Sequence, residues 1–409
     1  MDETKARNLP MTWETLRCAL SGVCAYRSLL ARPPLTSAAA LLSALARGDG
    51  PAALEAYAGL FYAVRQEGYD SLNAWLGDAL RYEEGPYPLL AERGGDDSAL
   101  EQAARRDVAT FSLVAGLDGE MLFSELAALL PPELTPLLAD YPRWAIGEPL
   151  DFDGLKRFYQ ANGAGLFARY RAFLWQEGAL RPVADPDCMG GGELIGYERQ
   201  RNQVIANTRA MLEGNLVNNV LLYGDTGAGK SVTVKSLLAV PGFDDLRLIE
   251  VDKGDLGDLP DLIRILAPRR QKFILFIDDL AFDQDDRTYS VLKTILEGGL
   301  ERRPANVAVY ATSNRRHLVR QTFSDRAGDE VDATETIAEK TSLSDRFGLR
   351  IPYLSMDKAE FLAMVETMAA QYGITMEREA LRTAAVRFEA RHPGRTPRVV
   401  RQFIASLNM

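Results

Sequence analysis

A glycine-rich loop that ends in lysine and serine carries the clearest chemistry in this sequence. Residues 224–231 read Gly-Asp-Thr-Gly-Ala-Gly-Lys-Ser and follow a short apolar segment, residues 220–223. Glycines let a backbone turn its N–H groups onto phosphate oxygens, and a helix that starts at the loop adds the positive end of its dipole. We expect Lys230 to contact the β- and γ-phosphates of ATP or ADP and Ser231 to hold Mg²⁺. The predicted nucleotide contacts are Gly224, Asp225, Thr226, Gly227, Ala228, Gly229, Lys230, Ser231 and Val232.

Two acidic residues follow a second apolar run. Residues 273–277 read Phe-Ile-Leu-Phe-Ile, as in a parallel strand buried on both faces, and Asp278 and Asp279 come next. Asp278 is expected to hold Mg²⁺ directly or through water, and Asp279 to orient or deprotonate the attacking water. The alternative is a buried strand capped by two solvated aspartates.

Three more polar residues follow in an order that suggests a complete site. Asn314 comes after a third apolar run, residues 307–311, where its side chain can reach the γ-phosphate or its water. Asparagine is also common in turns and helix caps, so this signal is weak alone. Arg346 lies in Leu-Ser-Asp-Arg-Phe, residues 343–347, and Arg398 lies near the start of a C-terminal helix. In isolation, each arginine is equally consistent with a surface charge.

The order Lys230, Asp278, Asn314, Arg346, Arg398 resembles the AAA+ ATPase superfamily. The resemblance implies that residues 224–231 are Walker A, that Asp278 and Asp279 are Walker B, and that Asn314 is sensor 1. It also implies that Arg346 is the arginine finger and Arg398 is sensor 2. A short motif upstream is similar to the one that lines the adenine pocket in this superfamily; it consists of Leu194, Ile195, Gly196 and Tyr197.

The amino-acid sequences of several segments are more closely similar to a bacterial family of uncharacterised ATPases, Domain of Unknown Function 815. This resemblance covers most of the chain, and it implies a fold and a nucleotide without implying a cellular task. The segments that carry it are residues 165–175, 218–224, 273–280, 313–318 and 343–347.

Two positions leave questions within this pattern. The second Walker B acid is usually glutamate, whereas Asp279 is one methylene shorter, about 1.5 Å. Because a misplacement of about 1 Å can cost on the order of 10²-fold in rate, we expect slow hydrolysis unless backbone placement compensates. Arg395 lies close to the same C-terminal helix as Arg398 and is the other candidate for sensor 2; we prefer Arg398.

The segments around these residues predict an α/β fold. Apolar runs at 220–223, 246–251, 273–277, 307–311 and 349–353 predict a P-loop parallel sheet with helices on both faces, and the nucleotide is expected outside the carboxyl ends of its strands. Nothing in residues 1–180 alternates like a strand. We therefore expect an all-helical N-terminal domain over 1–180, a linker over 181–192, the ATPase core over 193–355 and a small helical lid over 356–409.

Composition agrees with a globular protein of the cytoplasm. The 409 residues are 47% hydrophobic and 25% charged, and no span is long enough for a membrane helix. Residues 1–7 lack the apolar core of a signal peptide. Three cysteines without metal-ligand spacing and only two histidines favour a reducing compartment and argue against zinc.

Charge argues against nucleic acid as the favoured partner. Residues 1–190 contain 26 acids and 17 bases, a net charge of −9, whereas residues 191–409 have a net charge of −1. DNA binding requires lysine and arginine at the phosphates, so the N-terminal domain is a poor candidate. A local basic face remains open; its members are Arg302, Arg303, Arg315, Arg316 and Arg320.

These observations favour a Mg²⁺-dependent ATPase that couples its nucleotide state to the remodelling or assembly of a protein partner, which meets the N-terminal domain. Because arginine fingers of the superfamily act in trans, the resemblance implies a homo-oligomeric ring or open spiral in which Arg346 completes a neighbour's site. Two alternatives stay open. One is a DNA-linked loader or motor, and the other is a slowly hydrolysing, nucleotide-gated scaffold.

Overall fold

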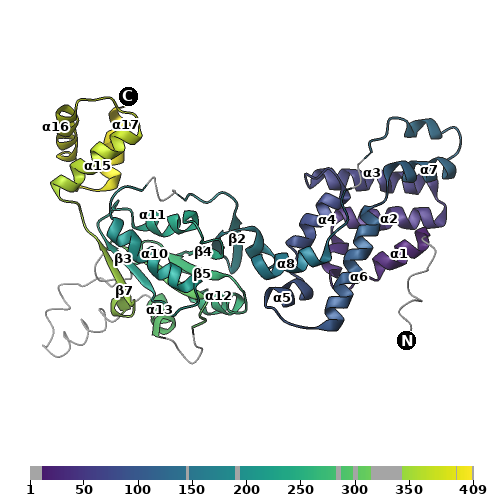
Figure 1. Ribbon diagram of the computed structural model, residues 1–409, viewed down its shortest axis with the longest axis horizontal. Helices are drawn as coiled ribbons and strands as arrows, with labels where there is room; N and C mark the ends of the chain where they lie inside the picture. The colour runs from purple at the N-terminus through teal and green to yellow at the C-terminus, as the bar shows by residue number, and fades with distance from the viewer. Residues whose placement is uncertain are drawn as a thin grey trace. The chain divides into compact units, whose positions relative to one another are not determined.

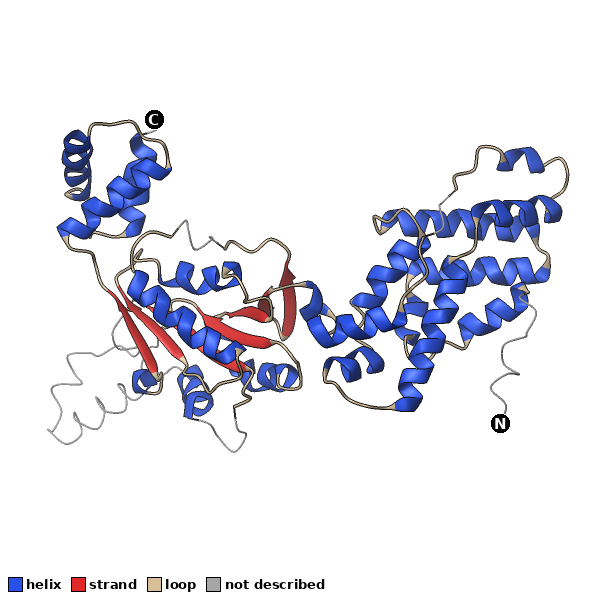
Figure 2. Ribbon diagram, viewed as in Figure 1, coloured by secondary structure: helices blue, strands red, loops and turns tan. Residues whose placement is uncertain are grey.

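The computed structural model describes residues 12–143, 147–188, 194–281, 287–297, 303–314, 343–392 and 394–407. The chain divides into two compact units, residues 1–169 and residues 170–409. The first consists of helices, and the second combines a sheet with helices (Figures 1 and 2). None of the helices in the described part of the chain combines the length and the apolar character that crossing a bilayer requires.

Side-chain caps and proline starts define the helices of the first unit. Asp49, Ser71 and Asp97 each accept a hydrogen bond from a backbone N–H in the first turn of the helix that follows, at 3.0–3.1 Å; such a cap typically contributes about 1 kcal/mol. The helices are α1 (Trp13–Ser21), α2 (Pro33–Arg47), α3 (Gly50–Gln66), α4 (Leu72–Arg81), α5 (Pro86–Glu92), α6 (Ser98–Ala115), α7 (Gly119–Leu129), α8 (Phe152–Asn162) and α9 (Leu166–Arg169).

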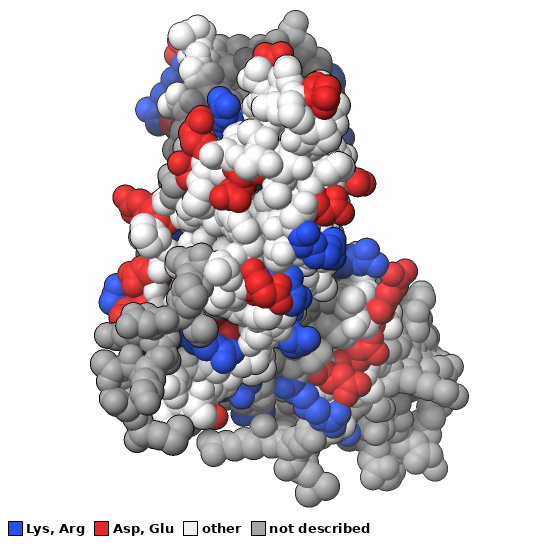
Figure 3. Space-filling model, turned by 90° about the vertical axis from the view of Figure 1, so that its right-hand side faces the viewer, with Lys and Arg blue, Asp and Glu red and all other residues white. Residues whose placement is uncertain are grey.

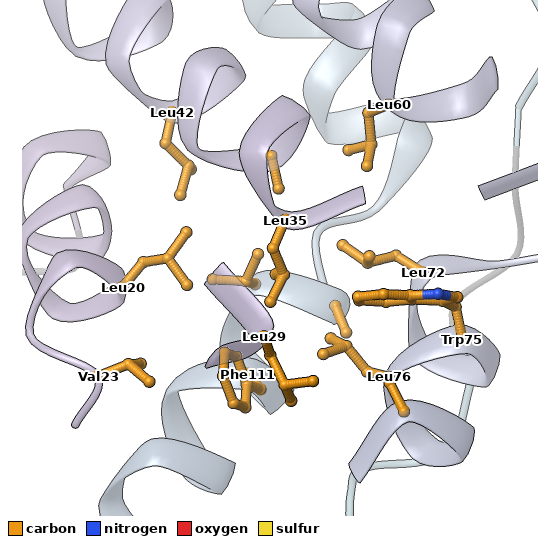
Figure 4. Packing of buried hydrophobic residues seen from close by; sticks show 14 of the residues in the cluster. Leu20, Val23, Leu29, Leu35, Leu42, Leu60, Leu72, Trp75, Leu76 and Phe111 are labelled. Atoms are coloured by element: carbon orange, nitrogen blue, oxygen red, sulfur yellow. The ribbon is translucent and has the colours of Figure 1, made fainter. Parts of the chain in front are cut away.

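The helices of this unit enclose one apolar core. Leu35 and Leu42 of α2 lie near Leu20, Leu29 and the ring of Phe111, and Leu72 and Trp75 of α4 close the core on another side (Figure 4). A buried carboxylate adds a polar anchor: Asp107 of α6 accepts backbone N–H groups of Cys24, Ala25 and Tyr26 at 2.9, 2.7 and 3.3 Å. The segment between α1 and α2 is thereby held against α6.

The second unit contains a seven-stranded sheet in the order β2-β1-β4-β5-β6-β3-β7. All neighbouring strands are parallel except the β1–β2 hairpin. The strands are β1 (Ala172–Gln176), β2 (Ala179–Val183), β3 (Val220–Gly224), β4 (Leu246–Val251), β5 (Lys272–Ile277), β6 (Val307–Ser313) and β7 (Leu349–Tyr353). The five predicted strands and the predicted P-loop α/β class are confirmed.

Helices cover both faces of this sheet (Figure 1). On one face, α10 (Glu198–Leu212) and α11 (Lys230–Lys235) pack their apolar side chains against β3, β5 and β6. The helices α12 (Leu259–Leu266) and α13 (Arg287–Glu297) lie on the other face. Every residue of β6 is buried, and so is β5 after its first residue. The run at 273–277 therefore marks a central strand buried on both faces, as predicted, whereas the run at 349–353 forms the edge strand β7.

Three C-terminal helices form the expected lid. They are α15 (Lys358–Gln371), α16 (Arg378–Glu389) and α17 (Pro397–Leu407), and they share a small apolar core. A capping box begins α15: Asp357 accepts the N–H of Glu360 at 2.8 Å, and the Glu360 carboxylate accepts the N–H of Asp357 at 3.0 Å.

The predicted domain boundary at residue 180 is wrong. The helical unit ends at Arg169, because β1 pairs with β4 inside the sheet and β2 extends the edge of the sheet. Glu177 and Gly178 join the two strands with φ values of 54° and 73°, as in a two-residue hairpin turn. The expectation of no strand before residue 180 fails with the boundary, and the expected linker over 181–192 begins within β2. Residues 189–193 lie outside the described residues.

Candidate nucleotide-binding site

The predicted phosphate loop joins β3 to α11 at the carboxyl edge of the sheet. Gly224 has a φ of 136°, and any side chain there would clash with the carbonyl oxygen of Tyr353. Gly227 also has a left-handed φ, 79°, and α11 begins at Lys230. The strand–loop–helix arrangement that phosphate binding requires is therefore present.

Lys230 is anchored inside this loop. The residue is 6% exposed, and its Nζ donates hydrogen bonds to the carbonyl oxygens of Gly224 and Asp225 at 2.9 and 2.8 Å. A third hydrogen bond, 2.9 Å, goes to Oδ1 of Asn314. Burial lowers the pKa of Lys230, and the carboxylates of Asp279, Asp225 and Asp278 partly oppose this shift. The ammonium group is thus fixed at the base of the loop.

Asn314 links Lys230 to one of the two predicted acids. Its Nδ2 donates to Oδ1 of Asp279 at 2.7 Å, while its Oδ1 accepts from Lys230. These three residues come from α11, from the end of β6 and from the end of β5. They meet because the carboxyl ends of neighbouring parallel strands share one edge of the sheet.

The two residues predicted to hold Mg²⁺ are in direct contact. The hydroxyl of Ser231 donates to Oδ1 of Asp278 at 2.6 Å. Mg²⁺ in nucleotide sites is typically bound by one or two protein oxygen ligands together with phosphate oxygens and water. A hydroxyl and a carboxylate beside a phosphate loop supply such a donor set, so the residues present fit the ion.

A cavity of about 610 Å³ lies over these residues, which is a typical size for a small-molecule site. Gly224 and Asp225 lie at the base of the loop and bind Lys230 through their carbonyl groups. The predicted residues that line the cavity are Leu194, Ile195, Gly196, Tyr197, Thr226, Gly227, Ala228, Gly229, Lys230, Ser231, Val232, Asp278, Asp279, Asn314 and Arg398.

Two tyrosines shape the end of the cavity where the resemblance places adenine. The rings of Tyr197 and Tyr353 stack with centroids 4.9 Å apart, and the Tyr197 hydroxyl donates to the carbonyl oxygen of Leu354 at 2.5 Å. Burial raises the pKa of each tyrosine to about 12, so both rings are neutral near pH 7. Neutral aromatic and aliphatic surfaces suit a purine base.

The structure separates the two candidates for sensor 2. Arg398 lines the cavity, and its backbone N–H donates to the carbonyl oxygen of Gly227 at 3.3 Å. The two residues are so close that a Cβ added to Gly227 would lie 2.9 Å from the Cβ of Arg398. Arg395 instead faces Glu389, with 3.4 Å between Nε and Oε1, and is not among the lining residues. The geometry therefore favours Arg398, and its role at the phosphate stays a prediction.

Arg346 lies apart from the residues gathered at the cavity. It is half-buried in a short segment anchored by Leu343 and Phe347, both of which are fully buried. The described residues that line the cavity do not include it. Its role as an arginine finger for a neighbouring subunit stays a prediction.

Several lining residues were missed by reasoning from the sequence. Arg401 follows Arg398 by three positions on α17, so helical spacing places both on one face. Thr312 lies on β6 and precedes Asn314 by two positions, so strand alternation continued one residue past the end of β6 places both on one side of the sheet. The spacing of Arg401 and Thr312 from predicted site residues could therefore have identified them from the sequence. The others, Arg201, Thr233, Tyr353, Met368, Pro397 and Gln402, reach the cavity through tertiary packing.

Comparisons with known proteins give one family match and structural matches of low identity. Residues 168–409 match the model of a family described as "Protein of unknown function (DUF815)". A search of curated proteins finds no match. Among solved structures, the RuvB Holliday junction branch migration motor of Thermotoga maritima is 18% identical with a TM-score of 0.36, and covers 53% of this chain. A DNA replication initiation factor is 13% identical with a TM-score of 0.35, and covers 55%. This chain spans 63% and 65% of their lengths, less than two thirds of either.

Proposed function

The chain belongs to the DUF815 family, and we propose that it is a Mg²⁺-dependent ATPase of the AAA+ type. The observation that carries the proposal is the convergence of three motifs on one cavity. Lys230, Asn314 and Asp279 form a continuous hydrogen-bonded chain, and Ser231 contacts Asp278 beside it. A phosphate-binding loop needs only the lysine and the serine. The carboxylate of Asp279 and the side-chain amide of Asn314 are the additional groups that hydrolysis requires.

Each side chain has a distinct task in the proposed reaction. The Lys230 ammonium binds the β- and γ-phosphate oxygens, and Ser231 and Asp278 would hold Mg²⁺, which would neutralise negative charge on the phosphates when bound. Asp279 accepts a hydrogen bond from the attacking water and takes its proton. Asn314 contacts both Lys230 and Asp279, and it therefore places the acid relative to the γ-phosphate.

We further propose that turnover requires a second copy of the chain. Arg346 is displaced from the cavity of its own chain, which supports the idea that its guanidinium reaches the γ-phosphate of a neighbour. A ring or an open spiral would place each Arg346 in this position. The helical unit, which has its own core, would receive the resulting motion and pass it to a protein partner.

A DNA-linked function receives less support. Arg303, a member of the basic face considered above, donates to Oδ1 of Asn219 and to the carbonyl oxygen of Val217 at 2.6 and 2.7 Å, so its guanidinium serves an internal contact. The other four arginines of that face lie outside the described residues. On the face drawn in Figure 3, acidic and basic side chains of the described residues are interspersed around uncharged surface. Such a surface lacks the continuous positive electrostatic potential that favours binding to duplex DNA.

A titration with ATP and ADP tests the site. Lys230→Ala should lose at least roughly 10-fold in ATP affinity, because charged hydrogen bonds to phosphate are each worth about 1.5–3 kcal/mol. Lys235→Ala is the matched control: this lysine ends the same helix but pairs with Glu250 at 3.1 Å. The control should bind ATP normally. Equal affinities for the wild type and Lys230→Ala would refute the assignment.

The same preparation distinguishes the classes of function. Phosphate release should require Mg²⁺ and should not respond to added duplex DNA. Stimulation by DNA would instead favour the loader or motor, and ATP binding without phosphate release would favour the nucleotide-gated scaffold.

A further inference from the structure

The hydroxyl group of Thr312 lies between the two acids that follow β5. Thr312 is the penultimate residue of β6 and is 1% exposed. Its Oγ1 donates to Oδ1 of Asp278 at 2.5 Å and accepts the backbone N–H of Asp279 at 2.9 Å. One buried side chain therefore contacts both residues to which the proposed reaction assigns metal binding and proton transfer.

The register of the sheet brings about this contact. Ile277, the last residue of β5, pairs with Ala311 of β6, so the next residue along each strand is Asp278 on one side and Thr312 on the other. The carbonyl oxygen of Thr312 also accepts the N–H of Leu280 at 2.7 Å. Thr312 thus binds the chain on both sides of Asp279.

The backbone of Asp279 needs such support. Its φ is 49°, in the left-handed region that residues other than glycine seldom adopt. Aspartate tolerates this conformation better than most residues, but surrounding contacts must still hold it. The hydrogen bond from the Asp279 N–H to Thr312 is a direct restraint on this turn, and the Asp279 carboxylate then reaches Asn314.

The carboxylate of Asp278 is oriented by the same hydroxyl. Both Ser231 and Thr312 donate to its Oδ1, at 2.6 and 2.5 Å, and the backbone N–H of Asp279 makes a longer contact of 3.2 Å to the same oxygen. Among the described residues, no hydrogen bond reaches its Oδ2. The two hydroxyls therefore fix the rotation of the carboxylate and leave one oxygen available to a metal ion. Partners of this kind, one step removed from a metal, typically contribute 10-fold to 100-fold to metal affinity or activity.

We propose that Thr312 is a positioning residue for both acids: it orients the Asp278 carboxylate toward Mg²⁺ and holds Asp279 in the turn that directs its short side chain at the attacking water. This inference rests on the proposed ATPase function. The contacts of Thr312 would also supply the backbone placement by which Asp279 compensates for being shorter than glutamate.

The test compares Thr312→Val, which keeps the shape and removes the hydroxyl, with Thr312→Ser, which keeps the hydroxyl. Thr208→Val is the matched control, because Thr208 is fully buried in the same unit and its hydroxyl contacts Val204 and Tyr310 away from the cavity. The readouts are phosphate release at saturating ATP, the Mg²⁺ concentration that gives half-maximal release, and ATP affinity without Mg²⁺.

Thr312→Val should lower phosphate release roughly 10-fold to 100-fold and raise the Mg²⁺ requirement, while ATP affinity without Mg²⁺ stays within about twofold of wild type. Thr312→Ser should restore most of the activity, and Thr208→Val should leave the Mg²⁺ requirement unchanged. If Thr312→Val does not fold, Thr312→Ala makes the same comparison with less bulk. A wild-type Mg²⁺ requirement and turnover in a folded variant without the hydroxyl would overturn the proposal, and so would a serine variant as impaired as the valine variant.

Failure of this inference can be distinguished from failure of the proposed function. If the wild-type protein releases no phosphate, the ATPase proposal fails, but the Mg²⁺ dependence of ATP binding still reports on Asp278. Thr312→Val must then weaken the gain in ATP affinity that Mg²⁺ produces in the wild type. An equal gain in both proteins would overturn the role of Thr312.

Discussion

Replacing Arg398 by alanine should weaken ATP binding far more than the same change at Arg395. Arg398 is the second residue of α17, the last helix of the lid; it contacts the phosphate loop at Gly227 and lines the cavity. Arg395 lies three residues earlier and faces Glu389 instead. The two variants remove the same chemical group from almost the same place in the sequence, so the comparison isolates the contact with the nucleotide.

The expected magnitudes follow from these surroundings. A guanidinium that binds a phosphate oxygen makes a charge-assisted hydrogen bond, worth about 1.5–3 kcal/mol. Arg398→Ala should therefore raise the Kd for ATP about 10-fold to 150-fold. The Arg395–Glu389 pair is partly exposed, with side-chain exposures of 36% and 22%, and such a pair contributes at most about 1 kcal/mol. Arg395→Ala should change the Kd by no more than roughly fivefold.

Calorimetric titration of ATP and ADP into each variant measures both effects. If Arg398 contacts the γ-phosphate, its loss should affect ATP more than ADP, since ADP lacks that group. A thermal unfolding curve of each variant without nucleotide checks that the lid remains folded. A larger loss of ATP affinity in Arg395→Ala than in Arg398→Ala would refute the reasoning, because it would show that the lid presents its other arginine to the nucleotide.

Two further predictions concern assembly and the helical unit. Arg346→Ala should bind ATP nearly normally but lose on the order of 10³-fold in turnover. Mixing it with Lys230→Ala should restore activity, because one mixed interface combines an intact Lys230 with an intact Arg346. If mixing restores no activity and the wild type stays monomeric in Mg²⁺ and ATP, the arginine finger does not act in trans. The isolated segment 12–169 should show a helical circular dichroism spectrum, and Asp107→Ala should destabilise it by about 3 kcal/mol in urea, because three N–H groups, two of them in buried residues, lose their acceptor. A spectrum of a disordered chain, or an unchanged urea midpoint, would contradict this account of the unit.

Much of the site could be predicted because its residues follow strands that the sequence marks clearly. Asp278 comes directly after one apolar run and Asn314 follows another by three positions, and a parallel sheet places such residues at a common edge. The loop at 224–231 has a spacing that few other structures require. In these cases local pattern and global topology agree, and Asp278, Asp279 and Asn314 line one cavity with Lys230.

Contacts that depend on register or on packing could not be read in the same way. A threonine near the end of β6 is visible in the sequence, but its position opposite Asp278 follows from pairing between strands about thirty residues apart. The strand β1 was missed for a related reason. Its residues are buried without a clear alternation, and its pairing with β4 and β2 is what separates this strand from the helical segments before it.

The most direct test of the central claim is phosphate release by the wild type and by Asp279→Asn at saturating ATP and Mg²⁺, with ATP affinity measured on the same samples. Asp261→Asn is the control, since this acid pairs with Arg264 at 2.6 Å on the surface. The wild type and the control should release phosphate. Asp279→Asn should bind ATP with an affinity similar to that of the wild type. It should release phosphate at least about 10²-fold more slowly, because the substitution keeps the shape of the side chain and removes the base. Equal release by Asp279→Asn and the wild type would contradict the account.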